Sequence, residues 1–205
     1  MREPASPNDD DLLRRIQAGD EAAFTALYRR WQGPLYRFAV RMSGRAAVAE
    51  DVTQETFMTL LRGGGGFDPS RGSLSAYLFG IARHRVQHRL EREHSYVPME
   101  GAGGAPEGGA GLPASDDDPH DALARRERIE RVRDAVLSLP LHYREAVVLC
   151  DLHHATYEEA AAALGCAVGT VRSRLHRGRE LLLGKLRSVA DASPALRRVS
   201  SAGVS

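Results

Sequence analysis

Cysteine is scarce in this chain of 205 residues, in which Cys150 and Cys166 are the two thiols. Two cysteines are too few for a disulfide framework, and their separation matches no metal-ligand spacing. Both lie among apolar residues, so we expect buried structural thiols. The eight histidines are scattered without ligand spacing, apart from the adjacent pair His153 and His154. The sequence therefore predicts no metal site.

Long apolar runs are also missing. No stretch approaches the roughly 18 to 20 consecutive apolar residues that a membrane-spanning helix needs, so we expect a soluble protein with no membrane insertion. The N-terminal sequence MREPASPNDDD is acidic and lacks the apolar segment of a secretory signal. These two absences predict a cytoplasmic protein.

Motifs for catalysis and nucleotide binding are not found. The sequence contains no Walker loop, no GxGxxG fingerprint and no defensible Ser/His/Asp or Cys/His arrangement. We therefore expect neither an enzyme nor a bound cofactor. The apolar fraction of 42% and the charged fraction of 27% are typical of a globular chain.

Lysine is nearly absent, because Lys185 is the one lysine among 28 basic residues and the others are arginine. A GC-rich genome produces the same bias, so position is more informative than the total. Residues 172–187 contain six basic residues and one acidic residue, whereas residues 94–124 contain six acidic residues and no Arg or Lys. A basic end and an acidic middle thus nearly cancel in the net charge of +1.

The acidic middle is rich in Gly and Pro and has few large apolar residues, so it cannot bury enough surface to offset its ordering entropy. On either side of it the apolar pattern is helical, with no alternating run long enough for a strand. We predict an all-α protein of two small helical domains joined by a flexible Gly/Pro/acidic linker. The boundaries are 10–93 for the first domain, 94–120 for the linker, 121–187 for the second domain and 188–205 for a disordered tail.

The first domain is predicted to contain helices at 10–18, 21–43, 46–62 and 74–93. Gly19 suits the end of the first helix, and Asp20 and Ser73 suit the caps of the second and fourth. The third helix has an inward apolar side made of Val48, Val52, Phe57, Leu60 and Leu61. Its outward side is Glu50, Asp51, Gln54 and Glu55, which is either a solvated surface or a face for a protein partner.

The second domain is predicted to contain helices at 121–137, 141–151, 156–164 and 168–186, with a break at Pro140. Thr156 and Glu159 have the spacing of a capping box, and Gly165 ends the third of these helices. The segment 156–182 has the form of a helix-turn-helix, a motif whose second helix enters the DNA major groove.

The last helix is two-sided. One side is apolar, and the other carries groups that can donate to base edges and phosphates. The alternative interpretation is a solvated basic face on an ordinary bundle helix. The alanine-rich helix and the glycine turn favour the DNA-binding interpretation over this alternative. The basic stretch 83–92 is similarly either a solvated surface or a second DNA contact.

Four segments resemble bacterial RNA polymerase sigma factors of the extracytoplasmic-function (ECF) type. They are AEDVTQETFMTLL (49–61), GSLSAYLFGIARHRVQHRLERE (72–93), LPLHYREAVVLCDLHHATYEEAAAALG (139–165) and VGTVRSRLHRGRELL (168–182). The resemblance implies two helical DNA-binding domains that dock on core RNA polymerase and confer promoter specificity. An anti-sigma factor is a further candidate partner.

The resemblance also assigns residues to three sites. The contact with core polymerase would be made by Asp51, Gln54, Glu55 and Phe57. The minus-10 region of promoter DNA would be read by Tyr77, Arg83, His84, Arg85, His88 and Arg89. The minus-35 region would be read by Thr170, Arg172, Ser173, Arg174, His176 and Arg177.

Two positions depart from the family pattern. His84 stands where the family usually has Asn, and His88 stands where Asp is common, so known minus-10 preferences do not transfer to this chain. The run of four glycines at 63–66 is also unusual and favours looser base capture in the adjacent loop. Two other hypotheses remain: a stand-alone helix-turn-helix regulator that binds an operator as a dimer, and a helical interaction module that does not touch DNA.

Overall fold

The computed structural model describes residues 8–62, 67–95 and 119–192 of the chain. In these ranges the protein is helical and contains no strand, which confirms the all-α prediction. The α-helices are α1 (Asp9–Gln17), α2 (Glu21–Ser43), α3 (Ala46–Arg62), α4 (Leu74–Ser95), α5 (Pro119–Leu137), α6 (Leu141–Val147), α7 (Tyr157–Leu164) and α8 (Val168–Ala192). A 3₁₀ turn, η1 (Pro69–Arg71), precedes α4, and a π-helical turn, η2 (Val148–Leu152), continues α6.

Local capping sets the ends of the helices in the N-terminal half. Gly19 has a positive φ of 87° after α1, and the Asp20 side chain accepts a hydrogen bond from the Ala23 amide at the start of α2. Ser73 Oγ accepts from the Ala76 amide at 3.2 Å and so caps α4. These three sequence predictions are confirmed.

The helix-turn-helix is defined by local signals as well. Thr156 Oγ1 accepts from the Glu159 amide at 3.1 Å, and the Glu159 carboxylate accepts from the Thr156 amide at 2.9 Å. This capping box starts α7, and Gly165, with φ +62°, ends it. Both predictions are confirmed.

The structure corrects several details of the sequence analysis. The predicted single helix 141–151 is α6 followed by a π-helical turn, and α8 runs to Ala192 rather than 186, so residues 188–192 of the predicted tail are helical. Leu61 is 47% exposed and does not face the core. Cys150 and Cys166 are half-buried rather than fully buried. Most of the predicted linker and the glycine run at 63–66 lie outside the described residues.

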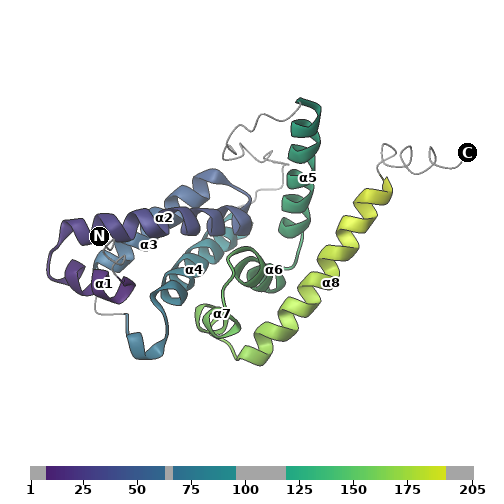
Figure 1. The fold of residues 1–205 in the computed structure, drawn as a ribbon. Coiled ribbons are helices and arrows are strands. Elements are labelled where there is room, and N and C mark those ends of the chain that lie inside the picture. Colours follow the sequence, from purple (N-terminus) through teal and green to yellow (C-terminus); the bar gives the residue numbers. More distant parts are fainter. Residues whose placement is uncertain (1–7, 63–66, 96–118, 193–205) are drawn as a thin grey trace, which may run out of the picture.

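The described helices form two bundles that lie side by side. Figure 1 shows α1 to α4 as one bundle and α5 to α8 as the other, with α6 and α7 between α4 and α8. One apolar cluster extends through both bundles. It includes Phe38 and Leu78 from the first bundle and Val136, Leu149 and Ala160 from the second. The two halves are therefore packed together, although they are far apart along the chain.

Helices α4 and α7 pack against each other across the boundary between the bundles. A Cβ atom on Gly80 would lie 3.5 Å from the carbonyl oxygen of Ala163, which is an ordinary van der Waals distance. Gly80 and Ala163 are therefore neighbours in this contact. Within the described ranges, none of the helices combines the length and the apolar character needed to cross a membrane.

Candidate nucleic-acid interface

The polar face of α8 gathers the residues expected to read the minus-35 region. Val171 and Leu175 are buried beneath it, with exposed fractions of 0% and 2%. Above them lie the exposed residues Arg172, Ser173, His176 and Arg177 and the half-buried residues Thr170 and Arg174. The six residues therefore share one accessible side of a helix, as recognition of a major groove requires.

Tyr157 lies next to this face and was missed by the sequence analysis. It is the first residue of α7, and the guanidinium carbon of Arg172 lies 5.5 Å from the centre of its ring. Such a cation–π contact orients the arginine. The two residues belong to different helices, so no periodicity within one helix could have revealed the pair.

An acidic residue also belongs to the polar face. Glu180 accepts a hydrogen bond from Arg177 at 2.9 Å and lies 3.5 Å from Nε2 of His176. The bond from Arg177 is the main cause of the lowered pKa of Glu180. Glu180 thus holds Arg177 within the face in the DNA-free protein.

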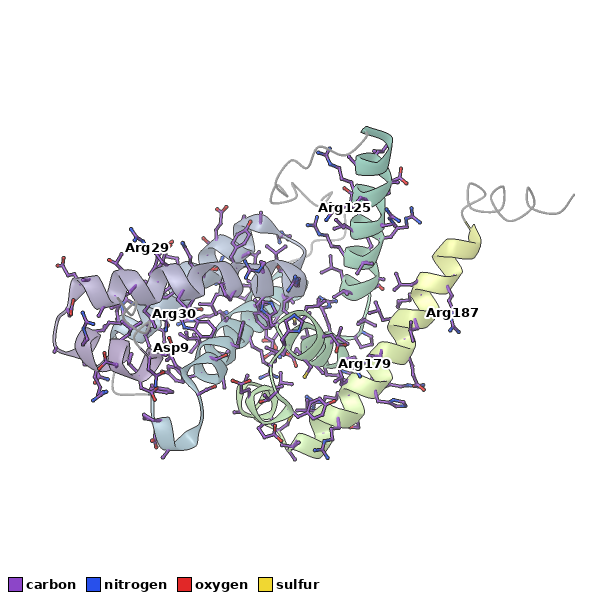
Figure 2. The ribbon with its side chains drawn as sticks, viewed as in Figure 1. Asp9, Arg29, Arg30, Arg125, Arg179 and Arg187 are labelled. Carbon is purple, nitrogen blue, oxygen red and sulfur yellow. The ribbon has the colours of Figure 1, made fainter. Side chains whose placement is uncertain are left out.

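The position of α8 against α6 is set by a close approach and an ion pair. A Cβ atom on Gly178 would lie 2.8 Å from Val147 Cγ2 and 3.3 Å from the Tyr143 carbonyl oxygen. The next residue, Arg179, donates two hydrogen bonds to the carboxylate of Asp151 in η2, at 3.0 and 2.5 Å. Figure 2 labels Arg179 on α8, with Arg187 further along the same helix.

The basic stretch of α4 is largely engaged inside the protein. Arg83 Nε donates to Glu145 at 2.7 Å, Arg85 donates to Thr59 at 3.1 Å, and Arg89 donates to both Asp51 and Glu55. In contrast, the side chains of His84 and His88 are exposed. The expected minus-10 residues thus lie near one another on α4, where His84 and His88 are exposed and the Arg85 side chain is 43% exposed.

A pocket of about 480 Å³ lies at the start of α4. Its lining includes Tyr77, His84 and Arg85, and the ring of Tyr77 packs 5.5 Å from that of Phe67. Aromatic side chains of this kind can stack on unpaired bases. Ala162 of α7 forms part of the same wall, so the second bundle lies at the edge of the pocket.

The outward face of α3 carries the residues expected to contact polymerase. Asp51 and Gln54 are exposed and Glu55 is half-buried. The prediction that Phe57 contacts polymerase has to be corrected, because Phe57 is only 3% exposed. The centre of its ring lies 6.2 Å from that of Phe24 and 4.7 Å from that of Tyr28. Its position supports the helix from within and offers no surface to a partner.

Residues 27–96 match the family model for Sigma-70 region 2, and residues 129–182 match the model for Sigma-70, region 4. The first match covers α3 and α4, and the second covers the helix-turn-helix. These two matches identify the chain as an RNA polymerase sigma factor.

Two curated relatives specify the family. The chain is 30% identical over 182 residues to the ECF RNA polymerase sigma factor SigW of Bacillus subtilis, covering 86% of this chain and 96% of that protein. It is 37% identical over 167 residues to the ECF RNA polymerase sigma factor SigE of Mycolicibacterium smegmatis, covering 80% of this chain and 63% of that longer protein. The chain belongs to the ECF RNA polymerase sigma factors.

A solved structure agrees in fold. The chain superposes with a TM-score of 0.61 and 26% identity on the sigma factor RpoE of Bartonella quintana, which was solved in complex with the anti-sigma factor NepR. The match covers 80% of this chain and 96% of that one. The chain therefore shares its overall fold with that sigma factor.

Proposed function

We propose that this chain binds core RNA polymerase through α3 and directs it to promoters through α4 and α8. It would act in the cytoplasm as a specificity subunit, while the chemistry of RNA synthesis remains with the polymerase. An anti-sigma factor is a further proposed partner, because the Bartonella sigma factor was solved in complex with one.

The observation that carries this proposal is the polar face of α8. Four exposed side chains, Arg172, Ser173, His176 and Arg177, lie on one side of a helix whose other side is anchored by Val171. Arginine can bind guanine edges or phosphates, and serine and histidine add shorter donors. A helix exposed in this way on a helix-turn-helix fits the reading of duplex DNA.

The outward face of α3 supports the second half of the proposal. Asp51 is 52% and Glu55 is 38% exposed at the side chain. Carboxylates repel the phosphates of DNA, so this face suits a protein surface with basic residues.

Run-off transcription tests the proposed function. Purified core polymerase is incubated with fragmented genomic DNA, with and without the chain. We expect defined transcripts that need both the chain and the core enzyme. Transcript patterns that do not change when the chain is added, together with tight operator binding by the chain alone, would instead identify a stand-alone regulator.

A further inference from the structure

Three arginines meet where the end of α2 lies against the end of α5. Arg37 and Arg41 are four residues apart on α2, so they lie on the same side of that helix. Arg133 is on α5, one turn before Leu137. Leu137 touches the end of α2, because a Cβ atom on Gly44 would lie 2.9 Å from its Cδ1 atom. This contact brings Arg133 close to the two arginines of α2.

Arg41 is held in place by hydrogen bonds to a distant part of the chain. Its Nη1 atom donates to the carbonyl oxygen of Leu152 at 3.0 Å and lies 3.2 Å from Nε2 of His153. Arg41 is half-buried, whereas Arg37 and Arg133 are exposed. The cluster thus combines one guanidinium group that is fixed with two that can turn toward a ligand.

The three positive charges of the cluster repel one another. Burial lowers the pKa of Arg41 most, and the charges of Arg37 and Arg133 lower it further. The pKa of the neighbouring His153 is lowered to about 3, first by burial and then by Arg41 and Arg37. Within the described ranges, none of the three arginines forms an ion pair with a carboxylate. The repulsion is therefore not offset by a neighbouring acid.

Several other arginines of the protein are neutralised where they lie. Arg83 binds Glu145, and Arg179 binds Asp151 through two hydrogen bonds. The cluster on α2 and α5 is different, because its charges converge from two helices and have no such partner in the described part of the chain. Guanidinium groups present paired N–H donors that match the oxygens of a phosphoryl group. Convergent arginines without an acid are therefore suited to an anion of this chemistry.

We propose that Arg37, Arg41 and Arg133 form a binding site for a compact diphosphate anion, either inorganic pyrophosphate or the diphosphate group of a nucleotide. Three charges that converge on one place suit an anion whose negative charges are close together. The phosphates of a DNA strand are instead spread along its axis. The residues of this site are not among those assigned to polymerase or promoter DNA, so the site does not depend on the proposed function.

Isothermal titration calorimetry of the full chain with inorganic pyrophosphate, in a chloride buffer, tests the site. The test variant is Arg37→Gln with Arg133→Gln, which removes the two exposed charges and keeps the bonds of Arg41. The matched control is Arg29→Gln with Arg128→Gln, which removes one exposed arginine from each of the same two helices. Arg29, labelled in Figure 2, is about 12 Å from Arg37 along the axis of α2.

We expect the unmodified chain and the control to bind one pyrophosphate with equal affinity, and the test variant to bind it at least tenfold more weakly. A parallel titration with ADP distinguishes the two sources of the diphosphate, since the true ligand binds more tightly.

Thermal melts provide a second measurement. Without pyrophosphate, the test variant should melt at a higher temperature than the control, because it has lost the repulsion within the cluster. Pyrophosphate should raise the melting temperature of the control and of the unmodified chain but not that of the test variant, because a ligand stabilises the folded state that binds it.

Three results would overturn the site. Equal affinity of the test variant and the control for pyrophosphate would show only a general attraction to a basic surface. A test variant that is no more stable than the control without pyrophosphate would show that the three arginines do not repel one another. Random-sequence duplex DNA at the same salt concentration provides the third comparison. If the test variant loses duplex binding and none of the proteins binds pyrophosphate or ADP, the arginines contact nucleic acid instead.

Discussion

Arg89 of α4 donates a hydrogen bond to Glu55 of α3 at 2.6 Å. The first residue is expected at promoter DNA and the second at core polymerase, so the two candidate interfaces meet in one ion pair. Arg89 also donates to Asp51 at 2.7 Å, and the bond to Glu55 is the main cause of its raised pKa. The proposed docking of polymerase on α3 would therefore involve two carboxylates that are bound to Arg89 in the free chain.

The double charge reversal Asp51→Arg with Glu55→Arg should abolish capture of core polymerase while the chain stays helical. It should also cost stability, because an exposed ion pair contributes about 0.2 to 1 kcal/mol and the new arginines repel Arg89. A pull-down against core enzyme and a thermal melt measure the two effects.

The matched control is Glu130→Arg with Asp134→Arg, which reverses two exposed charges at the same spacing on α5. We expect this control to capture polymerase normally. Equal capture by both double variants would show that the outward face of α3 is only solvated surface.

Arg174→Ala and Arg177→Ala should each weaken promoter binding. If the arginine contacts phosphate alone, the loss is uniform across sequences and the salt slope falls by about one unit. If it contacts a base, discrimination at one position falls by roughly 1 to 3 kcal/mol. Arg187→Ala, further along α8, is the control and should leave both quantities unchanged. If the variants at 174 and 177 behave like this control, the assignment of α8 to the DNA interface is contradicted.

The substitution Gly178→Ala should lower the free energy of unfolding by about 1 to 3 kcal/mol, as overpacking does in other cores. The added methyl group would meet Val147 and the backbone of Tyr143. Gly184→Ala is the control on the same helix, since a Cβ atom there has no neighbour within 4 Å. Greater helix propensity should make this control more stable. Urea denaturation distinguishes the two, and equal stabilities would contradict the close approach of α8 to α6.

Stability should fall as the pH drops from about 6.5 toward 3. Burial lowers the pKa of His153 from 6.5 to about 3, and the nearby Arg41 adds to the effect. The unfolded chain binds a proton in this interval and the folded chain does not, so acid favours unfolding, by at most about 1.4 kcal/mol per pH unit. Thermal melts of His153→Gln and of the unmodified chain, recorded across this pH range, isolate the contribution of His153. A pH dependence that is the same in both proteins would contradict it.

Local signals made much of the fold predictable. Asp20 and Thr156 cap helices through groups only three residues away, so their sequence spacing was sufficient. The same is true of Gly165, whose left-handed backbone ends α7 without help from distant residues.

Long-range pairing was not predictable from the same signals. Arg83 and Glu145 are 62 residues apart, and nothing in the periodicity of either helix indicates their contact. The two basic helices were expected to be separated by a linker, whereas burial of apolar surface packs the bundles together. The error at Leu61 has a related cause, because this residue lies at the edge of the apolar stripe, where only the neighbouring helix decides its burial.

Footprinting of one promoter obtained by run-off transcription tests the central claim most directly. The chain alone, core polymerase alone and the two together are compared on the same duplex at the same salt concentration. We predict that only the mixture protects both the minus-10 and the minus-35 regions. Equal protection of both regions by the chain alone would contradict the account, because it would show DNA reading that does not need polymerase docking.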